Sequence, residues 1–533
     1  MAMSKRAPVF LRDATGLVRE IGFFETVAIN LSNVSFGVGI LVILSTVSLF
    51  PGGDPVIGTL LGALLFVPLA AIYAMMTSSM PRSGGDYVFV SRALHPALGF
   101  VTAWTIILWT SFFEGANANY LFTVALGPAF SIIGSIEQNS SISGLGSMLA
   151  SPTLVIGGGI SFLVIMGLIA TFFGRGLFRL LSILLYSGII SLLLMAAILL
   201  ISGHVDFVSR FNAYSASYSG TSDYYNQLIS AANVPSVGFS WAQTINFLPI
   251  VAYSFMFISA QQDVGGEIKN APRVSYRAIL ATLLISAVFT AGIIYLARSV
   301  IGSTFLYAAS ALSTSSSYVL PVSPSYNFLI GVLTPNTVLL AVTQFLYLGW
   351  YLVLPPLGFL VVTRILLASS MDRVTPSLLA RVSDRFHTPY VGIWLLIILS
   401  SLSLVIYTVY ASILANLSAT LGVLLGAFLL VSIGAIIFPY SRRTKPLFES
   451  SPVQYRVLGV PVMTIAGTLS TLALLGLTYM YATNGAYGAN SPFSIAAVAF
   501  EFCSALVIFA ISYLYHKSRG LDLMLAFVQI PPE

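Results

Sequence analysis

The chain has 533 residues, of which 57% are hydrophobic and only 8% are charged. This composition excludes a water-soluble globular protein, because so much apolar surface cannot be hidden in a soluble core. The single cysteine, Cys503, excludes an internal disulfide. The four histidines, His95, His204, His387 and His516, stand far apart, so we expect no metal site and no cofactor.

Apolar runs of roughly 20 residues, long enough to cross a hydrocarbon core, recur along the chain. They predict an all-α integral membrane protein with about twelve membrane-spanning helices. The first run lacks a small-residue cleavage site and is predicted to be an uncleaved span. The predicted spans are 22–48, 56–80, 98–126, 154–173, 177–201, 241–263, 277–301, 337–367, 391–410, 413–438, 457–481 and 494–515.

The distribution of basic residues predicts the orientation, because short cytoplasmic loops retain lysine and arginine. With the N-terminus inside, all of the 23 lysines and arginines except Arg210 and Arg298 fall on the inner side. We therefore expect a multi-pass protein of the cell membrane, surrounded by lipid, with both termini cytoplasmic. The net charge of +6 then reflects topology and gives no support to nucleic-acid binding. Loops 203–240 and 302–336 are expected to be solvated.

Two predicted spans carry polar residues at mid-depth. In the first, residues 30–39 read NLSNVSFGVG; in the sixth, Pro249 is followed by YSFMFISAQQD at residues 253–263. Such positions favour unwound helix, where free amides and carbonyls can bind a solute. As first and sixth spans, the two breaks would correspond in two five-helix repeats, which is typical of an inverted-repeat transporter.

The expected chemistry of these breaks is complementary. A helix N-terminus at residues 35–39 would offer its amides and its dipole to a carboxylate, while carbonyls at residues 253–257 would accept from an ammonium. An alternative is that Gly37 and Gly39 only allow close packing of helices, as small residues do in membranes. The pairing with the break in the sixth span favours binding.

Glu114 falls near the middle of the third span, where a charge costs about 2.5 to 3.5 kcal/mol or more to insert. A functional carboxyl there would face a substrate ammonium or carry a coupling proton. The alternative is a structural carboxyl, protonated or paired with an amide such as Asn117 or Asn119. The predicted substrate-binding residues are Asn33, Val34, Ser35, Phe36, Gly37, Val38, Gly39, Glu114, Tyr253, Ser254, Phe255, Met256, Phe257 and Ser259.

Two further carboxyl residues, Asp263 and Glu267, lie at the inner end of the sixth span beside Lys269 and Arg273. Because basic partners stand so close in the sequence, an ion-paired cytoplasmic gate is one interpretation. A solvated turn is the other. Both are favoured over a role as substrate ligands.

Four motifs, in order along the chain, resemble the amino acid-polyamine-organocation (APC) superfamily of permeases. They are LVREIGFFE at 17–25, MPRSGGDYVFVSR at 80–92, the stretch 255–273 ending GGEIKNAPR, and MDRVTP at 371–376 with Thr388-Pro389 after it. The sequence departs from the superfamily at Ser35 and Phe36, where glycines are usual, and at residues 257–259, where Gly-Phe-Glu is common.

The resemblance implies a LeuT-like bundle of two inverted five-helix repeats with discontinuous helices 1 and 6, plus two C-terminal helices. It also implies alternating access, with the substrate held between spans one, three, six and eight. The corresponding division of the chain is a cytoplasmic segment 1–21, a first repeat 22–201, an extracellular loop 202–240, a second repeat 241–439, helices 11 and 12 in 440–516, and a cytoplasmic tail 517–533.

The function implied by the resemblance is secondary transport of amino acids. A polyamine or other amine permease or exchanger, a channel, and a non-transporting amino acid sensor on the same scaffold are alternatives. The sequence contains neither HExxH nor GxSxG, so we expect no enzyme activity. Because Glu114 is the single deep carboxyl among the predicted spans, amino acids with uncharged side chains are favoured over polyamines.

Two stretches of the sequence that lack particular residues limit which ion could drive transport. No charged residue occurs between Arg179 and His204, which removes the lysine of span five found in some proton-coupled relatives. No serine or threonine occurs between Thr343 and Thr363, which disfavours a sodium site of the type that uses span-eight hydroxyls. Exchange, facilitated transport and proton coupling through Glu114 remain.

Overall fold

The computed structural model describes residues 21–173, 176–234, 238–334, 336–383, 385–386, 388–410 and 421–527, with the side chains of 421–423 excepted. Most of the predicted segment 1–21, the end of the tail 517–533, His387 and the start of the predicted tenth span lie outside this part of the chain.

The described chain is almost entirely helical. Its first half contains α1 (Phe23–Val34), α2 (Phe36–Ser45), α3 (Pro55–Ser79), α4 (Gly85–Ala93), α5 (Pro96–Tyr120), α6 (Gly127–Ile136), α7 (Ser140–Leu149), α8 (Pro152–Phe172), α9 (Gly176–Ile201), α10 (His204–Ser219), α11 (Tyr224–Ala231), α12 (Trp241–Asn246) and α13 (Leu248–Met256). The second half contains α14 (Ala271–Ile301), α15 (Ser303–Leu312), α16 (Tyr326–Leu333), α17 (Thr337–Tyr347), α18 (Gly349–Leu352), α19 (Leu354–Met371), α20 (Tyr390–Val409), α22 (Leu421–Ile437), α23 (Lys445–Ser450), α24 (Val462–Thr483) and α25 (Pro492–Ser518).

Short elements connect these helices. Two strands, β1 (Arg456–Val457) and β2 (Val460–Pro461), form an antiparallel hairpin before α24. One π-helical turn, η2 (Leu121–Leu126), joins α5 to α6. The 3-10 turns are η1 (Val47–Leu49), η3 (Gly265–Glu267), η4 (Ser377–Ala380), η6 (Gly485–Tyr487) and η7 (Leu523–Phe527).

In the described chain, ten helical segments are long and apolar enough to cross a membrane. The predicted sixth and tenth spans correspond to the short helices α12 and α13 and to α22, which fall below that length. The predicted third span continues through η2 and α6, so that this helical segment runs over Pro96–Ile136. The predicted eleventh span begins later, at Val462, because residues 456–461 form the hairpin. The described chain is therefore that of an all-α membrane protein, as predicted.

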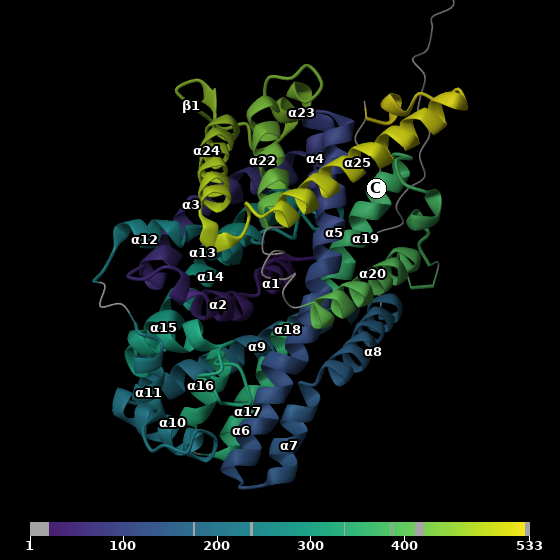
Figure 1. Cartoon of the computed structure of the whole chain (residues 1–533). Coiled ribbons are helices and arrows are strands. Elements are labelled where there is room, and N and C mark those ends of the chain that lie inside the picture. Colours follow the sequence, from purple (N-terminus) through teal and green to yellow (C-terminus); the bar gives the residue numbers. More distant parts are fainter. Residues whose placement is uncertain are drawn as a thin grey trace, which may run out of the picture.

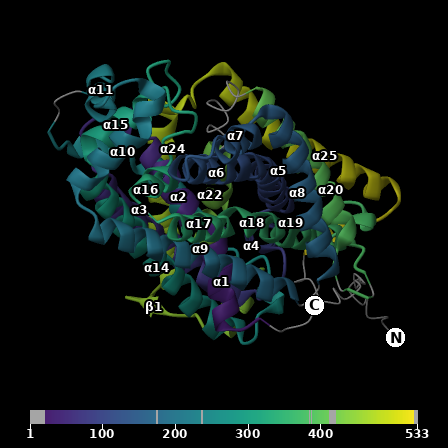
Figure 2. The same ribbon diagram turned by 90° about the horizontal axis from the view of Figure 1, so that it is seen from below.

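Helices of the two predicted repeats intermix in space. Viewed from below, α5, α8, α20 and α25 lie to the right, α3 and α14 lie to the left, and α2, α9 and α17 lie between them (Figure 2). Contacts between α3 and α14, and between α5 and α20, join elements that are far apart in the sequence. The breaks of the first and sixth spans lie inside this arrangement.

The two predicted loops are not simple solvated connections. They fold into α10, α11, α15 and α16, three of which gather with α7 at the lower end of the molecule (Figure 1). Phe207, Phe211 and Phe305 are fully buried there, and the rings of Tyr225 and Phe305 stack with centroids 4.5 Å apart. The prediction of solvated loops was wrong for these segments, because aromatic side chains bury large apolar areas.

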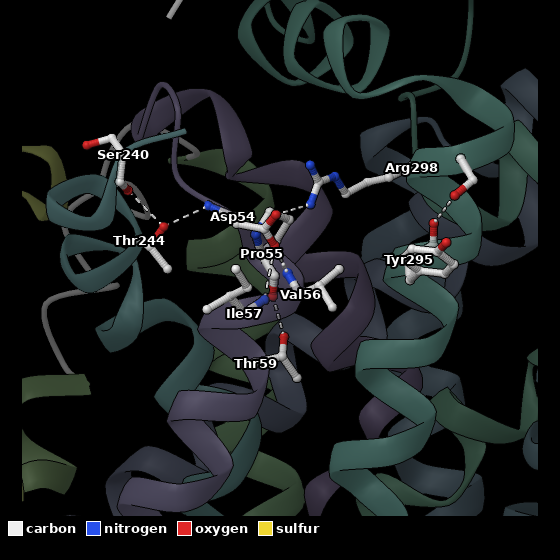
Figure 3. Close-up of polar contacts among 10 residues, drawn as sticks. Asp54, Pro55, Val56, Ile57, Thr59, Ser240, Thr244, Tyr295 and Arg298 are labelled. Carbon is white, nitrogen blue, oxygen red and sulfur yellow. Dashed lines mark hydrogen bonds and ion pairs between the residues drawn. The ribbon is translucent and has the colours of Figure 1, made fainter. Parts of the chain in front are cut away.

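Asp54 ties α3 to α14 at one end of the bundle (Figure 3). Its Oδ1 accepts from the backbone N–H groups of Val56 (2.8 Å) and Ile57 (3.0 Å), which caps α3. Its Oδ2 accepts from Arg298 Nη1 at 2.6 Å. Burial raises the pKa of Asp54, but the hydrogen bonds and the charge of Arg298 outweigh burial, so the pKa lies below its usual value.

We predict that Asp54→Ala lowers the free energy of unfolding by about 1 to 2 kcal/mol, because both a helix cap and an ion pair are lost. Asp54→Asn keeps a capping oxygen and removes only the charge, so its loss should be about 1 kcal/mol or less. Because the pKa of Asp54 is depressed in the folded state, its contribution is present at neutral pH and disappears as the pH falls through that lowered pKa.

Thermal unfolding in detergent at neutral and acidic pH measures these effects. Asp206 is the control site. It is exposed at the N-terminus of α10, and its carboxylate accepts from the backbone N–H of Gly203. Equal melting temperatures of Asp54→Asn and Asp54→Ala would show that capping of α3 by this side chain contributes nothing to stability.

Candidate functional site

The first span is interrupted at one residue. Ser35 has φ 42° and ψ 56°, a left-handed conformation that separates α1 from α2. Its N–H still donates to Leu31 O, and its carbonyl accepts from Val38 and Gly39. Of the first amides of α2, those of Val38 and Gly39 thus bind the Ser35 carbonyl, whereas those of Phe36 and Gly37 precede the first intrahelical hydrogen bond. The predicted break in helix 1 is present.

The sixth span unwinds after Met256, earlier than its predicted end at residue 263. Asn30 of α1 is fully buried, and its Oδ1 accepts from the N–H groups of Ala260 and Gln261, both at 3.0 Å. Its Nδ2 donates to Gln261 Oε1 at 3.0 Å. Because a side chain satisfies these amides, they need no helical partner.

A second asparagine joins the two breaks directly. Asn33 Nδ2 donates to the backbone carbonyl of Phe257 at 3.1 Å. This carbonyl is one of those expected to accept from a substrate ammonium, and in the structure it is already bound to Asn33. The two unwound segments are thus held against each other by Asn30 and Asn33.

A cavity of about 70 Å³ lies between the breaks. It is lined by residues of α1, α2, α4, α5, α13, α19 and α22 and of the segment after α13. Of the predicted binding residues, the lining includes Asn33, Val34, Ser35, Val38, Gly39, Glu114, Tyr253, Met256, Phe257 and Ser259.

The predicted binding residues outside this lining are Phe36, Gly37, Ser254 and Phe255. A methyl group on Gly37 would lie 2.6 Å from Trp350 Nε1, and one on Gly39 would lie 2.6 Å from Ser254 Oγ. Phe36 packs on Trp350 with ring centroids 4.6 Å apart. Close packing, the alternative interpretation of these glycines, is therefore what Gly37 does in the structure, while Gly39 both packs and lines the cavity.

Glu114 enters the cavity from α5. It is buried, and its Oε2 has no hydrogen-bond partner. The two amides considered as its partners bind elsewhere: Asn117 donates to Tyr351 O at 2.9 Å, and Asn119 donates to Thr408 Oγ1 at 3.1 Å. A buried carboxyl without a partner is costly, so this arrangement favours a ligand or a proton on Glu114.

The two predicted gate residues have different surroundings. Glu267 is bound by Arg364 of α19 through two hydrogen bonds, Nε to Oε1 at 2.9 Å and Nη2 to Oε2 at 3.2 Å. The basic partner of Glu267 is thus Arg364, rather than Lys269 or Arg273, which stand close to it in the sequence. Asp263 instead lines the cavity, and its Oδ1 has no hydrogen-bond partner.

Aromatic side chains separate this cavity from a larger one of about 240 Å³. Trp109, Phe113 and Tyr253 line both cavities. The rings of Trp109 and Phe257 stack at 6.2 Å with an interplanar angle of 8°. We call these four residues the aromatic layer; it closes the smaller cavity on the side of the larger one.

Several lining residues were missed from the sequence, among them Asp86, Trp109, Thr110, Phe113, Gln262, Leu354 and Gly358. Thr110 precedes Glu114 by one helical turn, so the helical period could have identified it. Asp86 carries no comparable signal, because it approaches the cavity only through the packing of α4 against other helices.

A family model described as amino acid permease matches residues 21–520. The chain belongs to this family. The permease is 25% identical over 472 residues to the branched-chain amino acid permease BcaP of Bacillus subtilis (strain 168), covering 86% of this chain and 88% of that protein. It is 22% identical over 484 residues to a methylthioribose transporter of the same strain, covering 88% and 89%.

These matches confirm the resemblance to the APC superfamily, which rested on four short motifs. The permease is a multi-pass membrane transporter with a small-molecule substrate, and it is not an enzyme. The match extends over all the described elements that line the cavity.

We predict that Gly37→Ala lowers the free energy of unfolding of the permease by about 1 to 3 kcal/mol, because the methyl group would overlap the buried Trp350 ring. Gly157→Ala is the matched control, since nothing lies within 4 Å of a methyl group there and alanine favours helix. Thermal melting of both variants in detergent tests this. A Gly37→Ala protein as stable as Gly157→Ala would contradict the packing described.

We also predict that Asn30→Ala destabilises the permease, since it leaves the buried amides of Ala260 and Gln261 without an acceptor, at about 1 to 3 kcal/mol for each unsatisfied group. Asn226→Ala, at an exposed asparagine of α11, is the control. Hydrogen exchange of a peptide covering residues 257–264 should accelerate in Asn30→Ala alone; unchanged exchange would exclude this role.

Proposed function

We propose that the permease moves amino acids across the cell membrane by alternating access, with the substrate bound in the cavity between the breaks of helices 1 and 6. The observation that carries this proposal is that the break residues Ser35 and Val38 and the unpartnered Glu114 line one cavity. A substrate carboxylate would bind the amides and the α2 dipole. The substrate ammonium would bind Glu114.

The rest of the lining supports an uncharged side chain. Val34, Val38, Leu354, Leu357 and Val361 contribute apolar surface to the cavity, and apolar surface favours an apolar group of the substrate. BcaP, by its name, transports branched-chain amino acids, which agrees with this chemistry. The methylthioribose transporter is similar over the same length, so family membership alone does not choose the substrate.

An amine permease or exchanger is the second candidate. It is favoured by the three carboxyl residues that line the cavity, Asp86, Glu114 and Asp263. A diamine would use more than one of them. An amino acid with an uncharged side chain needs only Glu114, and it then requires that Asp86 and Asp263 carry little net charge.

The aromatic layer provides the barrier that alternating access requires. Trp109, Phe113, Tyr253 and Phe257 lie between the two cavities, and rotation of these rings together with the segment after α13 would open the smaller cavity to the larger one. We propose that exchange or proton coupling drives the cycle; a sodium site is less well supported by the residues of α17 to α19.

We propose a cytoplasmic location for both termini in the cell membrane, on the basis of the arginine and lysine distribution. The two basic residues on the opposite side are both bound. Arg298 pairs with Asp54, and Arg210 donates to the carbonyl of Leu333. The charge of Arg298 is thus neutralised by a carboxylate, while Arg210 is hydrogen-bonded to a neutral carbonyl. The other 21 lysines and arginines carry the predicted orientation.

For the purified permease in liposomes, we predict uptake of a labelled uncharged amino acid such as leucine. Glu114→Gln should raise KM about 10- to 100-fold, because a charge-assisted hydrogen bond to the ammonium is lost. Glu449→Gln is the control, since Glu449 is exposed and forms a surface ion pair with Lys445.

The assay includes a panel of amino acids and diamines, with and without internal substrate. Acceleration by internal substrate would identify an exchanger, and uptake of diamines in place of amino acids would favour the second candidate. Specific binding without flux of any compound would overturn the transport proposal in favour of a sensor. An unchanged KM in Glu114→Gln would remove Glu114 from the binding site.

A further inference from the structure

Asp86 and Asp263 come together at the end of the cavity formed by α4. Asp86 lies in the first turn of α4, and Asp263 lies in the irregular segment after α13. Two backbone contacts hold these segments together: Gly84 N donates to Asp263 O at 3.0 Å, and Ser83 bridges to Val264. Both aspartates line the cavity.

Gly85 permits this close approach. It has φ +37°, and a methyl group built on it would overlap Asp263 Oδ1 and lie 2.7 Å from Gln262 Cγ. A side chain at this position would thus be strained and would displace Asp263. The carboxyl of Asp263 therefore packs against the backbone of the residue next to Asp86.

Among the described residues, neither carboxyl forms an ion pair with a cation. Asp86 is 0% exposed and Asp263 is 3% exposed, and the Oδ1 atom of each has no hydrogen-bond partner. The hydroxyl of Tyr73 donates to Asp86 Oδ2 at 2.9 Å. Two buried carboxylates at close quarters cannot both remain ionised without large cost.

The charged groups on the surrounding elements are engaged elsewhere. On α4, Arg92 pairs with Asp372 at 2.7 Å, and on α19, Arg364 pairs with Glu267 at 2.9 Å. The α5 helix contributes Glu114 to the same cavity. The α3 helix contributes Tyr73, the α1 helix contributes the neutral Asn33, and α22 contributes the apolar Leu424 and Phe428.

Neutral polar atoms point into the same space. Gln262 Oε1 and Ser259 Oγ are buried, line the cavity and have no hydrogen-bond partner. Both residues belong to the segment after α13, which also contains Asp263, and they line the same cavity as Asp86. Unpartnered polar atoms of this kind require a proton donor, water or a ligand.

We propose that Asp86 and Asp263 share a single proton at the α4 end of the cavity, and that loss of this proton is coupled to movement of the substrate. The inference rests on the proposed transport function. It assigns proton coupling to this pair, while Glu114 binds the substrate ammonium.

The coupling follows from where the two carboxyls are attached. Asp263 belongs to the unwound part of helix 6, whereas Asp86 belongs to α4. Movement of the unwound segment would separate the two carboxyls and hydrate them, so the single shared proton would pass to water and leave two carboxylates. Uptake of one proton from the opposite side of the membrane would restore the pair and close the segment again, so one proton would cross with each substrate.

The titration range agrees with this geometry. Burial raises the pKa of Asp86 to about 7, and the hydrogen bond from Tyr73 acts in the opposite direction. The paired state is therefore protonated below neutral pH and loses its proton as the pH rises through this range.

The test uses the full-length protein in liposomes that contain a pH-sensitive dye. Leucine uptake by the native protein should be stimulated by an inward proton gradient and should acidify the interior. Asp86→Asn and Asp263→Asn mimic the protonated state, so the ratio of gradient-driven to gradient-free uptake should fall to about one in each. Asp206→Asn, at an exposed site on α10, should keep the native ratio.

A second measurement does not depend on transport by the variants. Infrared difference spectra of the native protein in H₂O and D₂O should contain a protonated carboxyl band at neutral pH. The intensity of this band should fall in each asparagine variant, and any contribution from Glu114 should persist in both. The proposal would be overturned if both variants kept the native ratio of gradient-driven to gradient-free uptake. It would also be overturned if the native protein had no protonated carboxyl band.

The remaining outcomes are also decisive. Diamine uptake that requires both aspartates and moves no proton would assign the pair to substrate binding and would overturn proton coupling. Absence of both binding and uptake in the native protein would instead contradict the proposed function; gradient-independent leucine uptake by the native protein would contradict the proton pair alone.

Discussion

The structure depends on a single buried asparagine. Asn30 takes over the hydrogen bonds of two backbone amides that would otherwise require helical partners. In a membrane, an unpaired amide is so costly that a helix cannot unwind unless protein groups replace its lost bonds. Asn30 therefore permits helix 6 to end at Met256, and every polar feature of the cavity on that side follows from this interruption.

The break in helix 1 is stabilised by different physical means. Ser35 adopts a left-handed conformation without being glycine, and tight packing around Gly37 and Gly39 adds to the hydrogen bond that Asn33 donates to Phe257 O. The Trp350 ring fills the space above Gly37, and Ser254 packs on Gly39. Small residues here place α2 close to α13, so that one end of α2 borders the cavity.

Charge is distributed unevenly around the cavity. The ion pairs Arg364–Glu267 and Arg92–Asp372 are complete and buried, and they connect α19 to the segment after α13 and to α4. Breaking a buried pair leaves an isolated charge, so these contacts stabilise one arrangement of the helices strongly. The cavity carboxyls are not included in these pairs, which leaves them free to respond to a ligand or to a proton.

The sequence by itself determined the membrane class, most of the spans and the positions of both breaks, and it singled out Glu114, which lines the cavity in the structure, because long apolar runs and polar residues within them are local signals. It did not determine the end of helix 6, the partners of Asn117 and Asn119, or the folding of residues 203–240 into helices around a buried aromatic cluster. Nor did it identify Asp86. Only the tertiary structure decided these points, because each depends on atoms brought together from distant parts of the chain: Asn30 against Ala260, Arg364 against Glu267, and Asp86 beside Asp263.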